Sequence, residues 1–441
     1  MSKNWRKPRA SSPILPDFMH GYTSMPRPTG WTRFREWVLV WVCGSMLGAL
    51  AADAVIGSYD AGLQPIKPIL FTVGTVFTCI MAALVNRPRL CLATLGVALL
   101  PAARLFDAAV LRRFDSSFQD QVTMDLARMM LVLIAIIAVL STEKWEKTAL
   151  WAAICAMLLT TGSEIYEMLG LAKFSSIPGR YAGFNGHPNF PPVLLCEMLG
   201  VVFALSKNFR FNCLMIAVAV PGVALTYGRS GMIVLALLCG AYVLLNARRN
   251  FGFLMIVAAI VLPLVGIGTA ALESGTQQGV TKDKNTADRL EAIYNLDFDK
   301  LKSPERVKDL SDAWEAVQKK PIFGHGTGIS GTIFAPHNEY VSIWLEMGIP
   351  GLVLFAGMWL WLVTRSVLTR GRAGYLVFAL LAYTPFGQGR IEVPHFSFAM
   401  VVAACVLWPK RYQLTLRSLK SAPQAPAAFN PPHPQPLSRQ G

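Results

Sequence analysis

Long apolar runs, separated by short polar connections, make up most of the chain between residues 36 and 409. Each run has about 16 to 22 residues, which as a helix crosses or nearly crosses a bilayer core of roughly 30 Å. A lone strand facing lipid would leave its backbone groups unsatisfied, so every run is predicted to be a helix. The predicted spans are residues 36–55, 68–85, 90–109, 123–141, 148–166, 189–206, 211–227, 230–247, 251–271, 347–364, 373–388 and 394–409. The pattern predicts an all-α polytopic membrane protein with about twelve transmembrane helices.

The composition supports this prediction and argues against a water-soluble protein. Of the 441 residues, 53% are hydrophobic and only 15% are charged, and the mean hydropathy is +0.43. A net charge of +15 would suggest nucleic acid as the partner of a soluble protein. Here many basic residues lie in the connections between spans, where they set the orientation in the membrane, so no nucleic-acid partner is expected. All eight cysteines fall inside apolar runs and are interpreted as small hydrophobic residues, so neither disulfides nor a Cys-ligated metal are expected.

Short basic clusters occur in every second connection, which predicts the orientation through the positive-inside rule. The clusters are Arg33 with Arg35, Arg87 with Arg89, Lys144 with Lys147, Lys207 with Arg210, Arg248 with Arg249, Arg365 with Arg370 and Arg372, and Lys410 with Arg411. Both termini are therefore expected in the cytoplasm, with the first span as the insertion signal. The predicted organisation is a cytoplasmic tail at 1–35, nine spans at 36–271, an outward loop at 272–346, three spans at 347–409 and a disordered, Pro-rich cytoplasmic tail at 410–441.

The outward loop contains one clear helix pattern. Ser303 can cap a helix start and Pro304 suits the first helical position. Four apolar residues then recur at helical spacing, namely Val307, Leu310, Trp314 and Val317. An amphipathic helix is therefore predicted to end before Pro321 and to lie on the membrane face of the loop. The glycine-rich turn PIFGHGTGISG follows, and the run PHNEY at 336–340 is predicted to open a helix that leads into the tenth span.

Five short motifs follow one another on the predicted outward side. They are RYAGFNGHPN from Arg180 to Asn189, Arg229-Ser230-Gly231, Arg306 ahead of the P-x-x-G-x-G turn at 321–326, His337-Asn338-Glu339-Tyr340, and E-x-G-x-x-G-L at 346–352. In their order and sidedness the chain resembles the O-antigen ligase family, a branch of the lipid-linked glycan ligase and polymerase superfamily, over roughly residues 35 to 410.

The resemblance implies a GT-C-like membrane fold and a glycosyltransferase of lipopolysaccharide biosynthesis. Such an enzyme moves a glycan from undecaprenyl diphosphate to a sugar hydroxyl of lipid A-core. The resemblance places this reaction on the periplasmic face of the bacterial inner membrane, among membrane lipids and without a metal or another cofactor. The outward loop at 272–346 would then be periplasmic and would carry the catalytic histidine.

The motif residues suit the two requirements of this reaction. An imidazole titrates near neutral pH, so His337 is the candidate general base for the acceptor hydroxyl. Arginines stay charged and bind phosphate oxygens bidentately, so they can stabilise the leaving diphosphate. The candidate diphosphate- and glycan-binding residues are Arg180, Arg229, Arg306, its rival Arg289, His187, Asn189, Arg104 and Arg390. Asn338 and Glu339 are expected to satisfy first-turn amides and thereby orient the motif.

Each of these assignments has an alternative. The arginines can be interfacial residues that reach toward water or lipid phosphates, and His187 and Asn189 can simply start a helix. Asp297-Phe298-Asp299 has the D-x-D pattern of metal-binding glycosyltransferases, but sugar nucleotides are not expected on the outward side. For the whole chain, a polymerase or a protein O-glycosyltransferase of the same superfamily is the nearer alternative. An anion transporter is the more distant one, and no internal repeat of the kind found in many carriers is visible.

Overall fold

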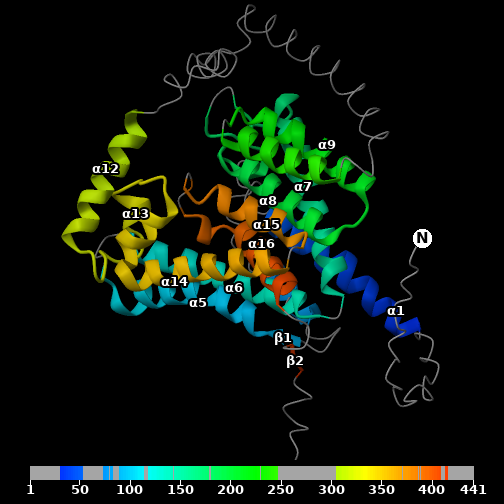
Figure 1. Ribbon diagram of the computed structural model, residues 1–441, viewed down its shortest axis with the longest axis horizontal. Coiled ribbons are helices and arrows are strands. Elements are labelled where there is room, and N and C mark those ends of the chain that lie inside the picture. The colour runs from blue at the N-terminus through cyan, green and yellow to red at the C-terminus, as the bar shows by residue number, and fades with distance from the viewer. Residues whose placement is uncertain are drawn as a thin grey trace, which may run out of the picture.

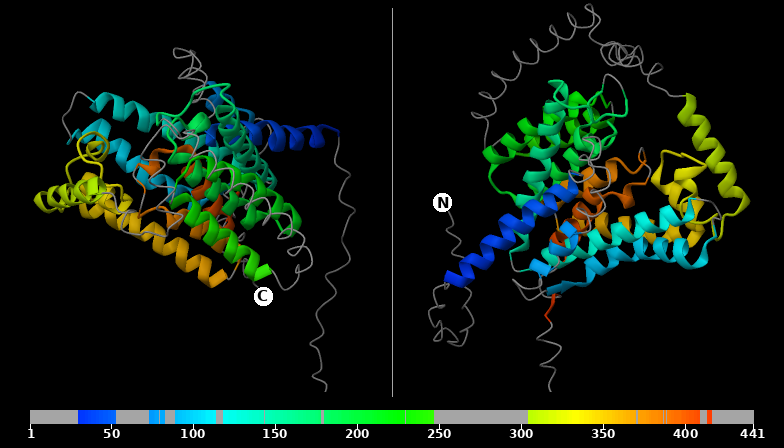
Figure 2. Two further views of the ribbon diagram at one scale, coloured as in Figure 1. Left: turned by 90° about the horizontal axis from the view of Figure 1, so that it is seen from above. Right: turned by 180° about the vertical axis from the view of Figure 1, so that it is seen from behind.

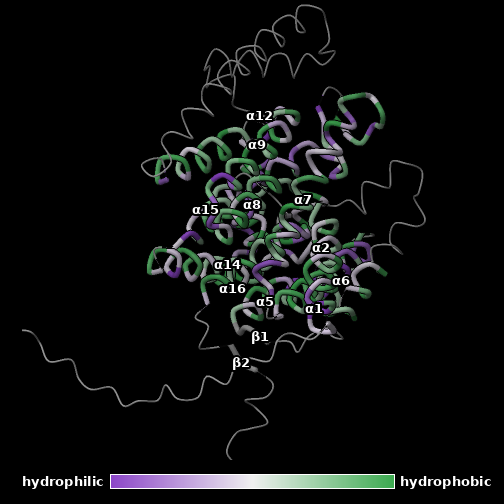
Figure 3. The backbone as a smooth tube through the Cα atoms, turned by 90° about the vertical axis from the view of Figure 1, so that its right-hand side faces the viewer, coloured by the Kyte–Doolittle hydropathy of each residue, from purple (hydrophilic) through white to green (hydrophobic). Residues whose placement is uncertain are grey.

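The structure is a computed structural model that describes residues 30–52, 73–78, 80–82, 89–113, 118–142, 144–177, 180–228, 230–246, 304–369, 371–385, 387, 389–408 and 413–415. These residues are helical except for connecting turns and two short strands, β1 (Arg89–Cys91) and β2 (Gln413–Thr415). Figure 1 shows the helices gathered into one bundle. Apolar residues dominate these helices along their length (Figure 3).

The elements follow one another in the order that the apolar runs predict. In the first half they are α1 (Gly30–Trp37), the π-helix η1 (Val38–Cys43), α2 (Gly44–Ala51), a helix at Val73–Ala82, α5 (Leu92–Phe106), the π-helix η2 (Asp107–Leu111), α6 (Gln119–Leu140), α7 (Trp145–Met168), the 3-10 turn η3 (Gly183–Asn185), α8 (Phe190–Leu205), α9 (Phe209–Leu225) and a helix at Ser230–Asn246. In the second half they are α12 (Pro304–Lys319), α13 (Ile329–Thr332), α14 (Glu339–Thr369), α15 (Ala373–Ala382), the 3-10 turn η4 (Arg390–Glu392) and α16 (Pro394–Leu407).

Five of the described helices are long and apolar enough to cross a membrane. They are Gly30–Ala51, Ala93–Leu111, Gln119–Leu140, Trp145–Met168 and Glu339–Thr369. Every predicted span that the structure describes contains one of these helices or a shorter apolar one, and the predicted span at 251–271 lies outside the described residues. The helical membrane protein is thus confirmed, whereas the number of spans and the periplasmic location of the long loop stay predictions.

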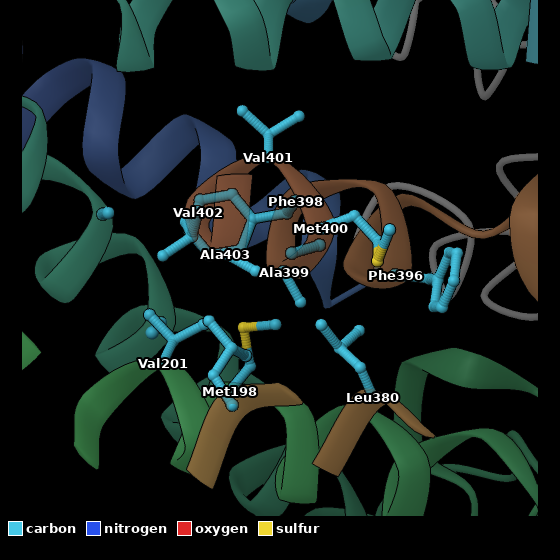
Figure 4. Close-up of a cluster of buried hydrophobic side chains, with 14 of the residues drawn as sticks. Met198, Val201, Leu380, Phe396, Phe398, Ala399, Met400, Val401, Val402 and Ala403 are labelled. Atoms are coloured by element: carbon cyan, nitrogen blue, oxygen red, sulfur yellow. The ribbon is translucent and has the colours of Figure 1, made fainter. Parts of the chain in front are cut away.

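The centre of the bundle is formed by α8 and α16, which are largely apolar and share one buried polar contact, 2.8 Å between Nδ1 of His395 and Oε2 of Glu197. Nearly the whole of α16 is buried, from Pro394 to Leu407, as expected for a helix without a polar face. Figure 4 shows Met198 and Val201 of α8 and Leu380 of α15 beside the apolar side chains of α16. Around this pair lie α7, α9 and α15 against α8, and α5 and α6 against α16.

The strands β1 and β2 join the two predicted cytoplasmic segments at one end of α5. They pair antiparallel, with Arg89 opposite Thr415. Residues 413–415 therefore form a strand where the sequence predicts a disordered tail. The chain leaves the other end of α5 through η2, where the loop after α12 is attached by hydrogen bonds to Asp107. The two predicted sides of the membrane thus lie at opposite ends of α5, as the charge pattern requires.

The helices α12 and α13 lie beyond the ends of α5 and α14 (Figures 1 and 2). As PHNEY predicts, α14 opens at Glu339, and its first segment runs to the predicted span start at 347, where a kink separates it from the second segment. Gly348, with φ +67° and ψ −158°, breaks its regular geometry. The long helix is thus a loop-side segment and a membrane segment joined at one glycine.

The predicted helix α12 is present, and it packs on the rest of the protein mainly through residues other than the four predicted apolar positions. Its buried residues are Ala313, Ala316 and Val317, which contact Ile329 and Leu345. Val307, by contrast, is 66% exposed. Small side chains let α12 approach α14 closely, so the alanines take the contact surface. Three of the four predicted apolar positions stay on the outside of the packed helix.

Candidate functional site

His337 lies just before α14, in an uncommon backbone conformation. Its φ of +49° is in the left-handed region, where most side chains are disfavoured. The next residue, Asn338, accepts hydrogen bonds from the backbone N–H groups of Tyr340 at 3.0 Å and Val341 at 3.2 Å. This is the geometry of a helix N-cap. The cap fixes the start of α14 and holds the partly exposed imidazole at the loop side of the bundle.

Two charged residues of α12 act on His337 from the neighbouring helix. Nε2 of His337 lies 3.9 Å from Oδ2 of Asp309, which is too long for a hydrogen bond but short enough for a strong charge interaction. The pKa of His337 is lowered from its ordinary value, chiefly by burial and then by the charge of Arg306, while Asp309 raises it. The imidazole is therefore neutral near pH 7 and able to accept a proton.

Arg180 is held in the loop between α7 and α8 by hydrogen bonds to two segments. It is only 5% exposed. Its Nε donates to the carbonyl of Thr226 at 2.7 Å, and its Nη2 donates to Oδ1 of Asn189 at 3.1 Å. Nδ1 of His187 in turn accepts from the backbone N–H of Asn189 at 3.3 Å. The motif RYAGFNGHPN is thus a folded unit that fixes one guanidinium beside one imidazole.

The same loop is anchored by a buried carboxylate that the sequence motifs do not contain. Oε1 of Glu167, near the end of α7, accepts from the backbone N–H groups of Phe174 at 2.8 Å and Ser175 at 2.6 Å. Its Oε2 accepts from those of Ala182 at 2.8 Å and Gly183 at 3.0 Å. Four backbone donors on one carboxylate leave the loop little freedom to move. Glu167 therefore positions the segment that carries Arg180.

The loop of Arg180 and the start of α14 meet around His187. The pKa of His187 is lowered by burial, and further by the charges of Arg180, Arg306 and His337. A charge has this effect only at short range in water-exposed regions. Residues from three separate parts of the chain are therefore close enough to His187 for their charges to lower its pKa. The structure brings together four of the predicted site residues as a basic cluster, defined here as Arg180, His187, Arg306 and His337.

Arg104, also a predicted ligand, is instead enclosed by carboxylates. The side chain is 2% exposed. Its Nη2 lies 2.7 Å from Oε2 of Glu346 and 2.5 Å from Oε1 of Glu392. The carboxylate of Glu339, which is 1% exposed, is also close enough to act on it. These acidic groups neutralise Arg104, so its placement favours a structural role. The backbone N–H of Glu339 donates to the carbonyl of Thr384 at 3.0 Å.

Two glycines join the P-x-x-G-x-G turn to the break in α14. An added Cβ at Gly324 would lie 2.6 Å from the backbone N of Gly348, and one at Gly348 would lie 2.7 Å from the backbone N of Gly324. The carbonyls of Leu345 and Glu346 accept from the N–H groups of His325 at 2.8 Å and Gly326 at 2.9 Å. Two motifs that are separate in the sequence thus form one contact, called here the glycine lock (Gly324 and Gly348).

The turn that follows is attached to the membrane helices through acidic side chains. Oε1 of Glu346 accepts from the N–H of Gly328 at 3.1 Å and the hydroxyl of Ser330 at 2.6 Å. Oδ2 of Asp107 accepts from both the N–H and the hydroxyl of Thr327 at 2.7 Å. The Oδ1 atom of Asp107 pairs with Arg113 at 2.5 Å. These contacts fix the loop that connects α12, with Arg306 and Asp309, to His337.

Some predicted residues lie outside the part of the chain that the structure describes. These are Arg229 and Arg289, and also Asp297 and Asp299 of the D-x-D pattern. Arg390 begins η4, but its side chain is not among those described. Within the described residues there is no group of three or more His, Cys, Asp or Glu side chains that could hold a metal ion.

Sequence reasoning missed the acidic residues that hold the site. Glu167 lies in an apolar run, and Asp107 lies at the end of another. An ionisable residue at such a position is costly unless it has a partner. An acidic residue in or beside an apolar run therefore indicates a buried partner, and a search for basic residues alone does not find it. Asp309 gave no such signal, because it lies on a polar helix.

Comparison with known families identifies part of the chain. Residues 214–356 match the model of the O-antigen ligase family. The match includes α12, the glycine turn, His337 and the E-x-G motif, and it ends inside α14. It therefore confirms the resemblance that the order of the motifs indicates. No curated protein matches the chain.

Proposed function

The chain is a membrane protein of the O-antigen ligase family, and on this premise we propose that it is an O-antigen ligase. It would transfer a glycan from undecaprenyl diphosphate to a sugar hydroxyl of lipid A-core. The observation that carries the proposal is the basic cluster. Cationic groups from the loop before α8 and from α12 act on the same histidine, beside the partly exposed imidazole of His337.

The basic cluster supports binding of a diphosphate. Arg180 and Arg306 keep their charge at any working pH, and guanidinium groups pair with phosphate oxygens in fixed geometry. Fixed cations next to the leaving group stabilise the negative charge that grows there as the bond breaks. Two arginine charges act on His187, and the carboxylate of Asp309 opposes Arg306 at His337.

His337 supplies the base for the acceptor. In the proposed step the acceptor hydroxyl oxygen bonds to the anomeric carbon, its proton passes to the imidazole, and the bond from that carbon to the diphosphate oxygen breaks. The diphosphate leaves with the electron pair, and inversion at the anomeric carbon is expected. Asp309 stabilises the imidazolium that forms, while Arg306 keeps the imidazole neutral beforehand.

The direct test uses purified protein, lipid-linked glycan and lipid A-core. We expect His337→Ala to slow the transfer by about 10²- to 10⁴-fold, which is the usual contribution of a general base. Arg306→Gln is compared with Lys308→Gln, which removes the same charge from an exposed position on the same helix. We expect a marked loss of transfer for Arg306→Gln and a rate near wild type for Lys308→Gln. Full activity of His337→Ala rejects the assigned base, and no transfer by the wild type rejects the function.

Lipopolysaccharide from a strain without the gene separates ligase from polymerase. For a ligase we expect core without polymer, while long polymer accumulates on the undecaprenyl carrier. A core that carries one repeat unit indicates a polymerase instead. Mass spectrometry of both lipid pools gives this answer without purified protein.

A further inference from the structure

The helix α12 has three distinct faces. Successive residues of an α-helix are turned by about 100°. The residues that pack on α14 are Ala313, Ala316 and Val317. The residues of a second, charged face are exposed, namely Lys308, Asp312, Glu315 and Lys319. The third face carries Val307, Leu310 and Trp314, which are 66%, 38% and 43% exposed. A helix that only met water and protein would need no third, apolar face.

The apolar face continues into the turn after α12. The rings of Trp314 and Trp344 meet edge to face with their centroids 5.4 Å apart. Nε1 of Trp344 donates to the carbonyl of Pro321 at 3.0 Å. Ile322 and Phe323 follow directly and are 57% and 68% exposed. We call Val307, Leu310, Trp314, Ile322 and Phe323 the apolar ridge.

The ridge lies at the level where a membrane span ends. The carbonyl of Phe323 accepts a hydrogen bond from Nη1 of Arg113, just after the candidate span Ala93–Leu111. Val110 and Leu111 in the last turn of this span are 62% and 51% exposed, as expected for side chains that face lipid. The ridge therefore adjoins, through the contact of Phe323 with Arg113, the end of a span whose side chains are exposed. Figures 1 and 2 show α12 beside the ends of α5 and α6.

We propose that the apolar ridge is inserted into the lipid leaflet on the loop side, at the boundary between head groups and acyl chains. Its occupant is therefore the membrane itself. Trp is enriched at this depth because its ring is apolar and its N–H is polar. The lysines of the charged face can reach lipid phosphates from there. Arg306 and Asp309 would consequently lie near the depth at which a lipid-linked diphosphate is presented.

The depth of α12 can be measured without any substrate, so the test does not depend on the proposed function. Leu310→Cys and the control Asp312→Cys are spin-labelled in the full chain and reconstituted in nanodiscs of phosphatidylcholine with phosphatidylglycerol. The wild type with its eight native cysteines gives the background labelling. Collision with oxygen, which enters lipid, is compared with collision with a water-soluble nickel complex.

We expect the label at 310 to collide with oxygen and to lose nickel collisions, while the label at 312 keeps them. Equal nickel access at both positions overturns the proposal, because α12 then stands in water. A label at 310 that is shielded from both reagents also overturns it, because protein then covers the ridge. Folding of each variant is checked by gel filtration and thermal unfolding, and Val307→Cys replaces Leu310→Cys if that variant does not fold.

Discussion

The glycine lock gives a prediction whose magnitude follows from geometry. We expect Gly348→Ala to destabilise the protein for two reasons. Its φ of +67° and ψ of −158° lie in a region that is open almost only to glycine, and forcing another residue there costs about 1 to 3 kcal/mol. The new Cβ would also overlap the carbonyl of Ile322 and lie 2.7 Å from the N of Gly324, and such overpacking costs about 1 to 3 kcal/mol.

The two costs together amount to about 2 to 6 kcal/mol. Relief of the overlap would move the turn away and weaken the bond from the N–H of Ile349 to the carbonyl of Ile322, which is now 3.0 Å long. Thermal unfolding in one detergent and at one scan rate measures the effect through tryptophan fluorescence. The expected fall in Tm is on the order of 5 °C, and the fixed scan rate makes the values of the variants comparable.

A second glycine of the same helix is the control. An added Cβ at Gly357 meets nothing within 4 Å, and alanine is a better helix former than glycine. Gly357→Ala should therefore leave Tm unchanged or raise it. If Gly348→Ala lowers Tm no more than Gly357→Ala does, the lock does not hold the loop to α14 and the reasoning is refuted.

Three further predictions follow from the site. Burial and Arg306 lower the pKa of His337, and Asp309 raises it. The acid limb of the pH profile of kcat/KM should therefore lie below pH 6.5, move to higher pH in Arg306→Gln and move to lower pH in Asp309→Asn. Shifts in the same direction in both variants would contradict the charge assignment. Glu346→Ala removes one of the carboxylates that pair with Arg104 and the acceptor of two loop hydrogen bonds, so it should cost about 1 to 3 kcal/mol of stability, measured as Tm, whereas Glu346→Gln keeps the acceptor and should lose less. Asn338→Ala removes the cap of α14 and should cost about 0.5 to 2 kcal/mol, whereas Asn338→Asp keeps an acceptor and should stay near wild type in the same assay.

The helices could be predicted because lipid allows the backbone few solutions. A long apolar run must satisfy its own N–H and C=O groups, so each predicted span within the described residues contains a helix. The short helix α12 was found by its proline start and periodic apolar residues. That its apolar face lies on the membrane stays a prediction, and hydrophobicity alone did not predict which residues pack on protein. The alanines that make the contact carry little signal of their own.

The basic side of the candidate site could be predicted from motifs, but the acidic side could not. The roles of Arg104 and Arg180 look alike in the sequence, since both lie near span ends. Only the fold shows that Arg104 meets Glu346, which belongs to a remote part of the chain. Charge partners of this kind depend on tertiary contacts between remote segments, which one sequence does not reveal.

Buried carboxylates explain how two separate loops can present cations to one place. Glu167 fixes the loop of Arg180 by accepting four backbone N–H groups. Glu346 and Asp107 fix the loop that joins α12 to α14 in the same way. Each carboxylate belongs to a helix of the bundle, so the loops take their positions from the rigid part of the molecule. The charged groups of the basic cluster repel one another, and the anchored loops hold them in place against that repulsion.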